Sequence, residues 1–336
     1  MRAITLNYDT RALELADIAE PVLERDGDVL VRVEEGGVCG TDHELANFSF
    51  GYPPPGSGYL VLGHEAIGQV VQTGRAVRGL VPGDWVVPMV RRACTSMCVS
   101  CARHRRDLCV SADYTERGIF GAHGYLTRFA VDAEEDLIRV PSNVADVGVL
   151  IEPLSVVEKA VETALRLHTG GADTCAVLGA GTIGILAALV MRKRGLEVTI
   201  HSAEARESSR VRMLEAAGLR YATELHGRFD IILEATGSNE AASHALGFLA
   251  PLGVFLLLGA KQSAQPFPFI QLIVQNQIVT GSVNAGPEHA LRAAEELGQL
   301  DRALLERMIY RVPLDRFEDS ILGTLSDKPK IVHVME

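Results

Sequence analysis

The sequence predicts an α/β protein in which a β-rich region is joined to a doubly wound parallel sheet. From about residue 150 onward, short apolar strands alternate with helical segments, which favours a parallel sheet with right-handed crossovers. A Gly-rich turn at residues 179–184 lies between one such strand and helix. The first third instead shows strands separated by Gly- and Pro-rich turns. A chain of 336 residues is long enough for two domains.

The first third is expected to form an irregular β-domain. Residues 28–33 (DVLVRV) and 66–72 predict strands, and residues 51–58 (GYPPPGSG) predict a loop dense in helix- and strand-breakers. Residues 81–87 (VPGDWVV) predict a turn followed by a strand.

The second region is expected to form the parallel sheet. A helix is predicted at residues 154–167, before an apolar strand at 174–178, and a second helix at 183–194 follows the Gly-rich turn. Further strands are predicted at residues 197–201, 230–233 and 254–258.

Four of the six cysteines fall within sixteen residues, at Cys94, Cys98, Cys101 and Cys109. Four thiolates on one short lobe can enclose a tetrahedral zinc ion and leave no position open, as a structural site requires. The alternative is two disulfides, which are typical of short, Cys-dense secreted chains. We therefore expect a structural zinc lobe at about residues 91–112.

Residues 179–184 (GAGTIG) match the G-x-G-x-x-G pattern of dinucleotide-binding loops. Gly179 permits the tight turn, Gly181 lets the backbone approach a pyrophosphate, and Gly184 lets helix and strand pack closely. The helix N-terminus attracts the anion. The predicted cofactor contacts in and near this loop are Gly179, Gly181, Thr182, Ile183, Gly184 and Thr236.

The segment after the strand at residues 197–201 decides between NAD and NADP. Glu204 can accept hydrogen bonds from ribose hydroxyls and repel a 2′-phosphate, whereas Ser202 and Arg206 can accommodate that phosphate. Glu204 and Arg206 can also be simply solvated in a loop. The sequence leaves both cofactors open, with a slight preference for NAD.

Cys39, His64 and Glu152 together can supply a thiolate, an imidazole and a carboxylate to a catalytic zinc ion. Glu65 can act as an alternating or supporting ligand, and Thr41 can pass on a substrate hydroxyl proton. Taken singly, Cys39 can be a buried core residue, His64 a hydrogen-bonded histidine, and Glu152 an acid at a helix start.

The amino-acid composition restricts the kinds of molecule that the protein is expected to bind. A formal net charge of -11 argues against nucleic acid and anionic membrane surfaces. Neither a signal peptide nor an apolar stretch long enough to span a bilayer is present, so a cytoplasmic location is expected.

With these features in hand, the chain resembles the medium-chain zinc-dependent dehydrogenases over essentially its whole length, most closely their microbial glucose dehydrogenase branch. The resemblance rests on several specific segments. They are residues 38–42 (VCGTD), 60–66 (LVLGHEA), 91–92 (RR), 106–109 (RDLC), 116–119 (ERGI), 150–154 (LIEPL) and 283–284 (VN).

The resemblance implies a GroES-like catalytic domain from residues 1–155 and 290–336, and a Rossmann domain from residues 156–289. It implies a catalytic zinc ion at Cys39, His64 and Glu152 with Glu65 close by, and a structural zinc ion on the four clustered cysteines. Four residues are implied to face sugar hydroxyls, and the last of them also belongs to the predicted cofactor contacts. These residues are Thr41, Glu116, Glu152 and Asn284.

Two substitutions relative to the branch predict fewer hydrogen bonds to a polyol. Val90 stands where an Asn is usual, and Val274 where a His can face the substrate. Residues 202–204 (SAE) replace an Asn-Arg-Arg phosphate clamp, which disfavours NADP. Asp42 is expected in a structural ion pair with Lys330.

We therefore predict a zinc-dependent oxidoreductase that transfers a hydride between a sugar, polyol or related alcohol and NAD(P). The alternatives are a threonine- or sorbitol-type dehydrogenase on the same fold, or a non-catalytic zinc- and nucleotide-binding redox sensor. A homodimer or homotetramer is expected.

Overall fold

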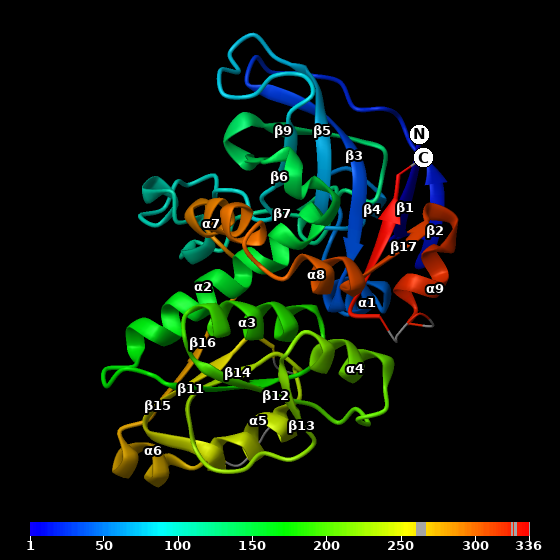
Figure 1. Cartoon of the computed structure of the whole chain (residues 1–336). Coiled ribbons are helices and arrows are strands. Elements are labelled where there is room, and N and C mark those ends of the chain that lie inside the picture. Colours follow the sequence, from blue (N-terminus) through cyan, green and yellow to red (C-terminus); the bar gives the residue numbers. More distant parts are fainter. Residues whose placement is uncertain (260–266, 324, 326–327, 336) are drawn as a thin grey trace. The chain divides into compact units, whose positions relative to one another are not determined.

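The computed structural model describes residues 1–259, 267–323, 325 and 328–335. The chain divides into two compact units (Figure 1). Unit 1 comprises Met1–Glu152, Asn284–Gln299 and Ile309–Glu336, and unit 2 comprises Pro153–Val283 and Leu300–Met308. The segment of unit 1 that was expected from residue 290 begins in this division at Asn284, and residues 300–308 belong to unit 2.

Unit 1 is built around a seven-stranded sheet. Its order is β10-β6-β5-β3-β18-β17, and β9 also pairs with β3. The strands are β3 (Asp28–Val38), β5 (Glu65–Thr73), β6 (Trp85–Pro88), β9 (Phe129–Ala133), β10 (Leu137–Val140), β17 (Ile309–Pro313) and β18 (Lys330–Val334).

Two smaller sheets complete the β-structure that the structure describes in unit 1. One has the order β2-β1-β4, with β1 (Arg2–Asn7), β2 (Ala12–Asp17) and β4 (Tyr59–Val61). The other pairs β7 (Glu116–Arg117) with β8 (Gly121–Ala122). Helices α1 (Gly40–Ala46), α7 (Pro287–Leu297) and α9 (Phe317–Ile321) also belong to this unit. The predicted strands at 28–33 and 66–72 lie within β3 and β5.

Unit 2 contains a parallel six-stranded sheet with the order β13-β12-β11-β14-β15-β16. The predicted α/β fold class is confirmed. Its strands are β11 (Thr174–Leu178), β12 (Glu197–His201), β13 (Arg220–Ala222), β14 (Phe229–Glu234), β15 (Leu249–Leu257) and β16 (Ile278–Gly281). Its helices include α2 (Ile151–Leu167), α3 (Thr182–Lys193), α4 (Ser209–Ala216), α5 (Asn239–Ala245), α6 (Phe269–Gln275) and α8 (Arg302–Met308).

Helix α2 begins three residues before the predicted start at 154. Proline is tolerated in a first helical turn because its missing N–H has no intrahelical partner there, so Pro153 does not end the helix. Among the described residues, no helix is long and apolar enough to cross a membrane.

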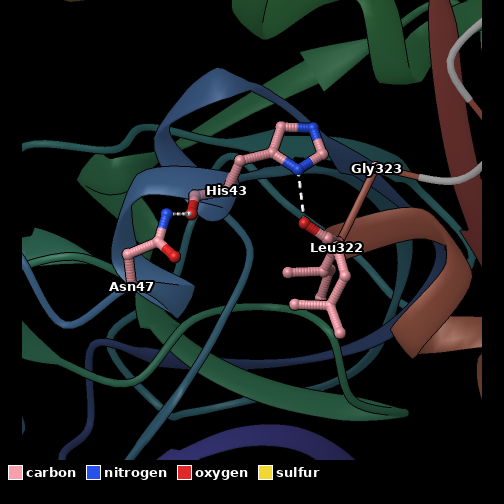
Figure 2. Close-up of a pocket in the computed structure, with 5 residues that line it drawn as sticks. His43, Asn47, Leu322 and Gly323 are labelled. Carbon is pink, nitrogen blue, oxygen red and sulfur yellow. Dashed lines mark hydrogen bonds between the residues drawn. The ribbon is translucent and has the colours of Figure 1, made fainter.

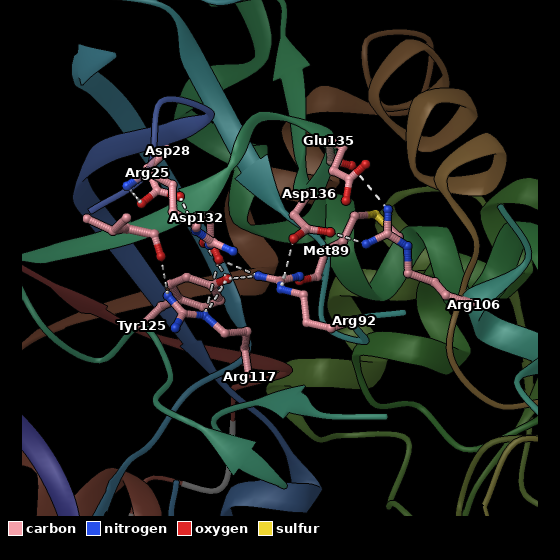
Figure 3. A network of polar contacts seen from close by, with 11 residues as sticks. Arg25, Asp28, Met89, Arg92, Arg106, Arg117, Tyr125, Asp132, Glu135 and Asp136 are labelled. Carbon is pink, nitrogen blue, oxygen red and sulfur yellow. Dashed lines mark hydrogen bonds and ion pairs between the residues drawn. The ribbon is translucent and has the colours of Figure 1, made fainter. Parts of the chain in front are cut away.

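Buried charges fasten the cysteine lobe, residues 91–112, to the rest of unit 1 (Figure 3). Arg92 forms ion pairs with Asp132 and Asp136, the latter at 3.1 Å, and Arg106 also pairs with Asp136. The Tyr125 hydroxyl accepts a hydrogen bond from Arg92 at 2.9 Å and donates one to Asp132 at 2.7 Å. Because nearly every charge here has a partner, removing one leaves another buried and uncompensated.

Candidate functional site

The four clustered cysteines converge in the folded chain. The sulfur atoms of Cys94, Cys98, Cys101 and Cys109 all lie within 4.8 Å of one another, and none of these residues forms a disulfide. Local hydrogen bonds favour the thiolate form at Cys98. Hydrogen bonds led by the Cys101 N–H lower the pKa of Cys98 to about 6, whereas burial raises the pKa of Cys101 to about 12. This donor set fits a closed tetrahedral zinc site better than the disulfide alternative.

A second group of metal-ligating side chains forms where α1 begins. Sγ of Cys39, a ring nitrogen of His64 and a carboxylate oxygen of Glu65 lie within 4.8 Å of one another. Cys39 is the N-cap of α1, and its sulfur accepts a hydrogen bond from the Thr41 N–H at 3.2 Å. Thr41 therefore lies in the first turn of α1, two residues after the candidate ligand Cys39. Gly63, with φ +86°, supplies the left-handed turn that precedes His64.

The electrostatics of this group suit a cation. Burial raises the pKa of the Cys39 thiol. Burial alone would lower the pKa of His64, but the Cys39 thiolate and the Asp42 carboxylate raise it well above its ordinary value. His64 Nδ1 is buried without a hydrogen bond among the described residues, 3.9 Å from Asp42 Oδ1. His64 Nε2 lies 3.1 Å from Cys39 Sγ and is the nitrogen placed to share a zinc ion with that sulfur, while Nδ1 faces the Asp42 carboxylate, as is common for metal-binding histidines.

The expected ion pair between Asp42 and Lys330 is replaced by another. The buried Lys330 ammonium pairs with Glu65 and donates to the Val38 carbonyl at 2.9 Å. Asp42 instead accepts the Cys39 N–H at 2.9 Å, completing the cap of α1. Gly37 leaves room for the Glu65 carboxylate, because a Cβ there would lie 2.3 Å from Glu65 Oε2. Sequence spacing alone did not reveal this Lys330–Glu65 pair.

Glu152 lies in the first turn of α2 and is not part of the group of ligand atoms within 4.8 Å. Its carboxyl group nevertheless interacts electrostatically with that group. Burial, reinforced by the negative charge of Glu65, raises the pKa of Glu152 to about 7. His64 and Lys330 oppose this shift. The structure thus brings Glu65, rather than Glu152, directly against Cys39 and His64, and assignment of the third ligand remains a prediction.

Glu116 and Asn284, predicted to face sugar hydroxyls, are in contact. Asn284 Nδ2 donates to Glu116 Oε1 at 2.7 Å, and Arg91 Nε donates to the same oxygen at 2.8 Å. Glu116 is 6% exposed, and its negative charge contributes to the raised pKa of Glu152. This acidic side chain therefore belongs to the electrostatic surroundings of the candidate metal site.

His43 lines a separate cavity of about 310 Å³ together with Asn47, Ile321, Leu322 and Gly323 (Figure 2). Its Nδ1 faces the Ile321 carbonyl oxygen. None of the predicted ligands or substrate contacts lines this cavity. His43 is half-buried.

The Gly-rich loop has the geometry of a dinucleotide-binding turn. Gly179, with φ +105°, follows β11, and Gly181 is the N-cap of α3, which begins with Thr182 and Ile183. A Cβ on Gly184 would lie 2.0 Å from the Gly179 carbonyl oxygen, so only glycine allows this helix to start so close to the strand.

Thr236 follows β14, and its methyl group would lie 3.1 Å from a Cβ on Gly179. The structure thus brings these two predicted cofactor contacts together at the carboxyl end of the sheet. Asn284, also predicted among the cofactor contacts, bonds to Glu116 in unit 1.

The segment after β12 holds a cation that the sequence analysis missed. Arg210 Nη1 pairs with Glu204 Oε1 at 2.7 Å, and the Ser208 hydroxyl donates to Glu204 Oε2 at 3.2 Å. Arg206 is exposed and donates to the Tyr221 carbonyl at 3.3 Å. Because Arg210 partly neutralises Glu204, repulsion of a 2′-phosphate is weaker than the sequence suggested. The sequence signal available for this ion pair was the position of Glu204 shortly before the start of α4 and of Arg210 in its first turn.

Val90 and Val274, which stand where polar residues are found in the glucose dehydrogenase branch, lie in different surroundings. Val90 is 5% exposed and belongs to the hydrophobic core of unit 1. Val274 lies on α6 in unit 2 and is 72% exposed. Neither side chain offers a hydrogen bond to a hydroxyl.

Comparison with known proteins gives a consistent family. The family described as glucose dehydrogenase C-terminus matches residues 145–331, and the alcohol dehydrogenase GroES-like domain matches residues 25–142. A glucose 1-dehydrogenase of Methanocella arvoryzae is 39% identical over 331 residues, covering 92% of each chain. A glucose 1-dehydrogenase of Thermoproteus tenax is 36% identical over 352 residues, covering 99% of each.

A solved structure is similar over the whole fold. The glucose dehydrogenase of Haloferax mediterranei, in complex with NADP, Zn and gluconolactone, has a TM-score of 0.91 and 31% identity, covering 100% of this chain and 99% of that one. The fold and the two cysteine-containing clusters define a zinc-dependent medium-chain dehydrogenase. The chain belongs to the medium-chain zinc alcohol dehydrogenase family, in its glucose dehydrogenase branch. The predicted family and enzyme class, an oxidoreductase acting on CH–OH groups, are confirmed.

Proposed function

We propose that this dehydrogenase oxidises a hydroxyl group of glucose or a closely related sugar, with NAD or NADP as the hydride acceptor. The observation that carries the proposal is the cluster of Cys39, His64 and Glu65 in the same unit as the buried Glu116–Asn284 pair. The first group can hold a metal ion, and the second offers polar atoms to a polyhydroxylated molecule. Relatives named glucose 1-dehydrogenase and the gluconolactone complex support this substrate class.

Cys39 and His64, with Glu65 or Glu152 as the third protein ligand, would hold a catalytic zinc ion. When bound, zinc polarises the substrate hydroxyl and lowers its pKa. Thr41, in the first turn of α1, is suited to pass the hydroxyl proton onward. Cys94, Cys98, Cys101 and Cys109 would hold the structural zinc ion.

The Gly-rich loop and the N-terminus of α3 would bind the cofactor pyrophosphate. The nicotinamide accepts the hydride from the carbon that bears the hydroxyl, and oxidation at the anomeric carbon of a cyclic aldose gives a lactone. Arg206 favours NADP and Glu204 favours NAD. NADP in the Haloferax mediterranei structure and the Arg210–Glu204 pair support including NADP as a cofactor.

A homodimer or homotetramer is part of this proposal. Strand β16 is the last strand of its sheet, and among the described residues its outer edge has no strand beside it. The nearby helix α6 exposes large apolar side chains, with Phe269 at 68%, Ile270 at 73% and Ile273 at 71%. An unpaired strand edge and an apolar helix suit pairing with a second copy across a two-fold axis.

The test is a panel of sugars, polyols and amino alcohols, scored by NADH and NADPH formation. Turnover strongest with glucose or a near relative supports the proposal, whereas preference for threonine or sorbitol favours the alternative dehydrogenases. Metal analysis addresses the redox-sensor alternative, because two zinc atoms per chain support the enzyme. One zinc atom per chain and no turnover with any substrate would support the sensor.

A further inference from the structure

Arg91 connects Glu116 to the cysteine lobe. The guanidinium is 7% exposed and donates from Nε to Glu116 Oε1 at 2.8 Å. From Nη1 it donates to the carbonyl oxygen of Asp107 at 3.2 Å. It also lies over the Tyr114 ring, 4.0 Å from the centroid. Three contacts on one planar side chain fix its orientation, which a flexible lysine cannot reproduce.

Both described hydrogen bonds to the Glu116 carboxylate end on the same atom. Arg91 Nε and Asn284 Nδ2 each donate to Oε1, and among the described residues no group donates to Oε2. The backbone supports the same arrangement, because Arg91 and Glu116 form an isolated antiparallel bridge. The carboxylate is therefore held from one side, and Oε2 is left to accept a hydrogen bond from a hydroxyl group.

The cysteine lobe also holds the segment that carries Asn284. Arg105 forms a two-bond ion pair with Asp107, at 3.1 and 3.0 Å, and reaches Glu288 at 3.3 Å. A Cβ on Gly286 would lie 2.9 Å from Asp107 Oδ1, so the backbone passes directly against this carboxylate. The lobe thus restrains both donors to Glu116, one through the Asp107 carbonyl and the other through residues 284–288.

We propose that Arg91 is a positioning residue for Glu116 and that the cysteine lobe, through Arg91 and Asp107, sets the affinity for polyhydroxylated substrates. This inference rests on the proposed function. The lobe then has a part in substrate selection, in addition to stabilising the fold. A polyol loses a correctly aimed acceptor when Arg91 is removed, while an isolated alcohol group loses little.

The neighbouring Arg92 provides a matched control. It is also largely buried, but its partners are Asp132, Asp136 and Tyr125 rather than Glu116 (Figure 3). Replacing either arginine by lysine removes the planar fork and keeps the charge. We expect Arg91→Lys to raise KM for glucose, and Arg92→Lys to lower the melting temperature with KM nearly unchanged.

A double-mutant cycle tests whether Arg91 acts through Glu116. Arg91→Met should raise KM for glucose about tenfold with kcat changed less than about threefold, the size expected for one charge-assisted hydrogen bond. In the Glu116→Gln background the same substitution should change KM less than about twofold, because its target is already altered. NADH binding, measured by fluorescence enhancement, should stay the same in all four proteins.

Equal effects of Arg91→Met in both backgrounds would overturn the inference. So would an unchanged KM in Arg91→Met. If Arg91→Met does not fold, Arg91→Lys takes its place in the cycle under the same criteria. Failure of the proposed function is distinguishable, because the unmodified enzyme would then oxidise no sugar or polyol while still binding NADH.

Discussion

At the scale of single residues, the candidate catalytic metal site gathers several acidic groups around the buried Lys330 ammonium and the His64 ring. Cys39, Asp42, Glu65 and Glu152 can all carry a negative charge, and Lys330 is the ammonium that pairs with Glu65. Buried charges of one sign are costly unless a counter-ion joins them. A divalent cation bound by Cys39 and His64 would take the place of the protons on these two ligands and join the acidic groups as a counter-ion.

Cys39→Ser should therefore lose one of two bound zinc atoms and almost all turnover. We expect kcat/KM to fall by about two orders of magnitude or more, since the metal supplies several kcal/mol of charge stabilisation. NADH binding should be retained, because the Gly-rich loop belongs to the other compact unit. Zinc content and NADH fluorescence are the measurements.

Cys175→Ala is the control for this substitution. Cys175 is buried in β11 and belongs to neither ligand cluster, so the variant should keep both zinc atoms and its turnover. Undiminished activity in Cys39→Ser would refute the zinc mechanism.

The choice of cofactor is also decided by single residues. Glu204→Ala should raise the ratio of kcat/KM for NADP to that for NAD by about tenfold, because one repulsive charge is removed and Arg210 is freed from its ion pair. Arg206→Ala should lower the same ratio. Steady-state kinetics with both cofactors at one ionic strength measures it. A ratio that neither substitution moves would place the discrimination elsewhere.

At the scale of elements, the periodic segments of unit 2 could be predicted well. The strands expected at 174–178 and 197–201 coincide with β11 and β12, because a buried parallel strand has a short apolar run with clear breakers on both sides. Strand β15 begins at Leu249, five residues before the expected start. Pro251 and Gly253 hid this part of the strand, since both are unfavourable in strand interiors.

The cysteine lobe should matter to stability more than to the chemical step. Its non-cysteine residues include five arginines and few large apolar side chains, so metal binding would supply much of its folding free energy. Cys98→Ser should lose one zinc atom and lower the melting temperature by about 5 °C or more. In the folded fraction kcat should stay near normal, whereas KM for sugars should rise through Arg91. A fully stable variant that loses kcat would argue against a structural role.

Asp230, at the start of β14, makes a pH-dependent junction with β11. Its Oδ2 accepts hydrogen bonds from the Asp173 and Thr174 N–H groups and from the Thr174 hydroxyl. Burial opposes the charge, but these bonds lower the pKa of Asp230 below its ordinary value. Its contribution to stability is therefore fully present above the unfolded pKa of about 3.9, and is lost as pH falls through the folded pKa.

Asp230→Asn should lower the free energy of unfolding at pH 7 by about 1 kcal/mol or more. The difference from the unmodified protein should shrink below about pH 4, because protonation then removes the same charge. Denaturant unfolding at pH 7 and pH 3 measures this. Ser49→Ala is a control expected to show no such convergence, because the exposed Ser49 hydroxyl donates to the Glu44 backbone carbonyl and not to a carboxylate. An equal gap at both pH values would contradict the assignment.

At the scale of the whole molecule, the sequence indicated which segments hold the site but not how its side chains pair. Motifs placed Cys39, His64 and the Gly-rich loop because these signals are local. The partner of Lys330 was predicted wrongly and Arg210 was missed, because both pairings depend on tertiary contacts, across β18 and β3 for Lys330 and between the segment after β12 and α4 for Arg210. The choice between Glu65 and Glu152 also depends on such contacts.

Self-association is the prediction that belongs to this scale. Ile273→Glu should reduce the particle mass toward that of one chain, because burying an unpaired charge in an apolar interface costs several kcal/mol. Val22→Glu is the control, since Val22 is similarly exposed, at 70%, but lies in unit 1. Light scattering measures the mass. An unmodified protein that is already a monomer would disprove the oligomer.

The positions at which the chain passes between its two units have a consequence for protein engineering. The first crossing lies between Glu152 and Pro153 and the second between Val283 and Asn284, so each seam touches a candidate site residue. A graft of residues 153–283 from a relative would import a foreign cofactor module while Glu152 and Asn284 stay with the host. Residues 300–308 would have to be exchanged together with residues 153–283, because they belong to the same compact unit. Chimeras cut two or three residues outside these seams would exchange substrate contacts as well.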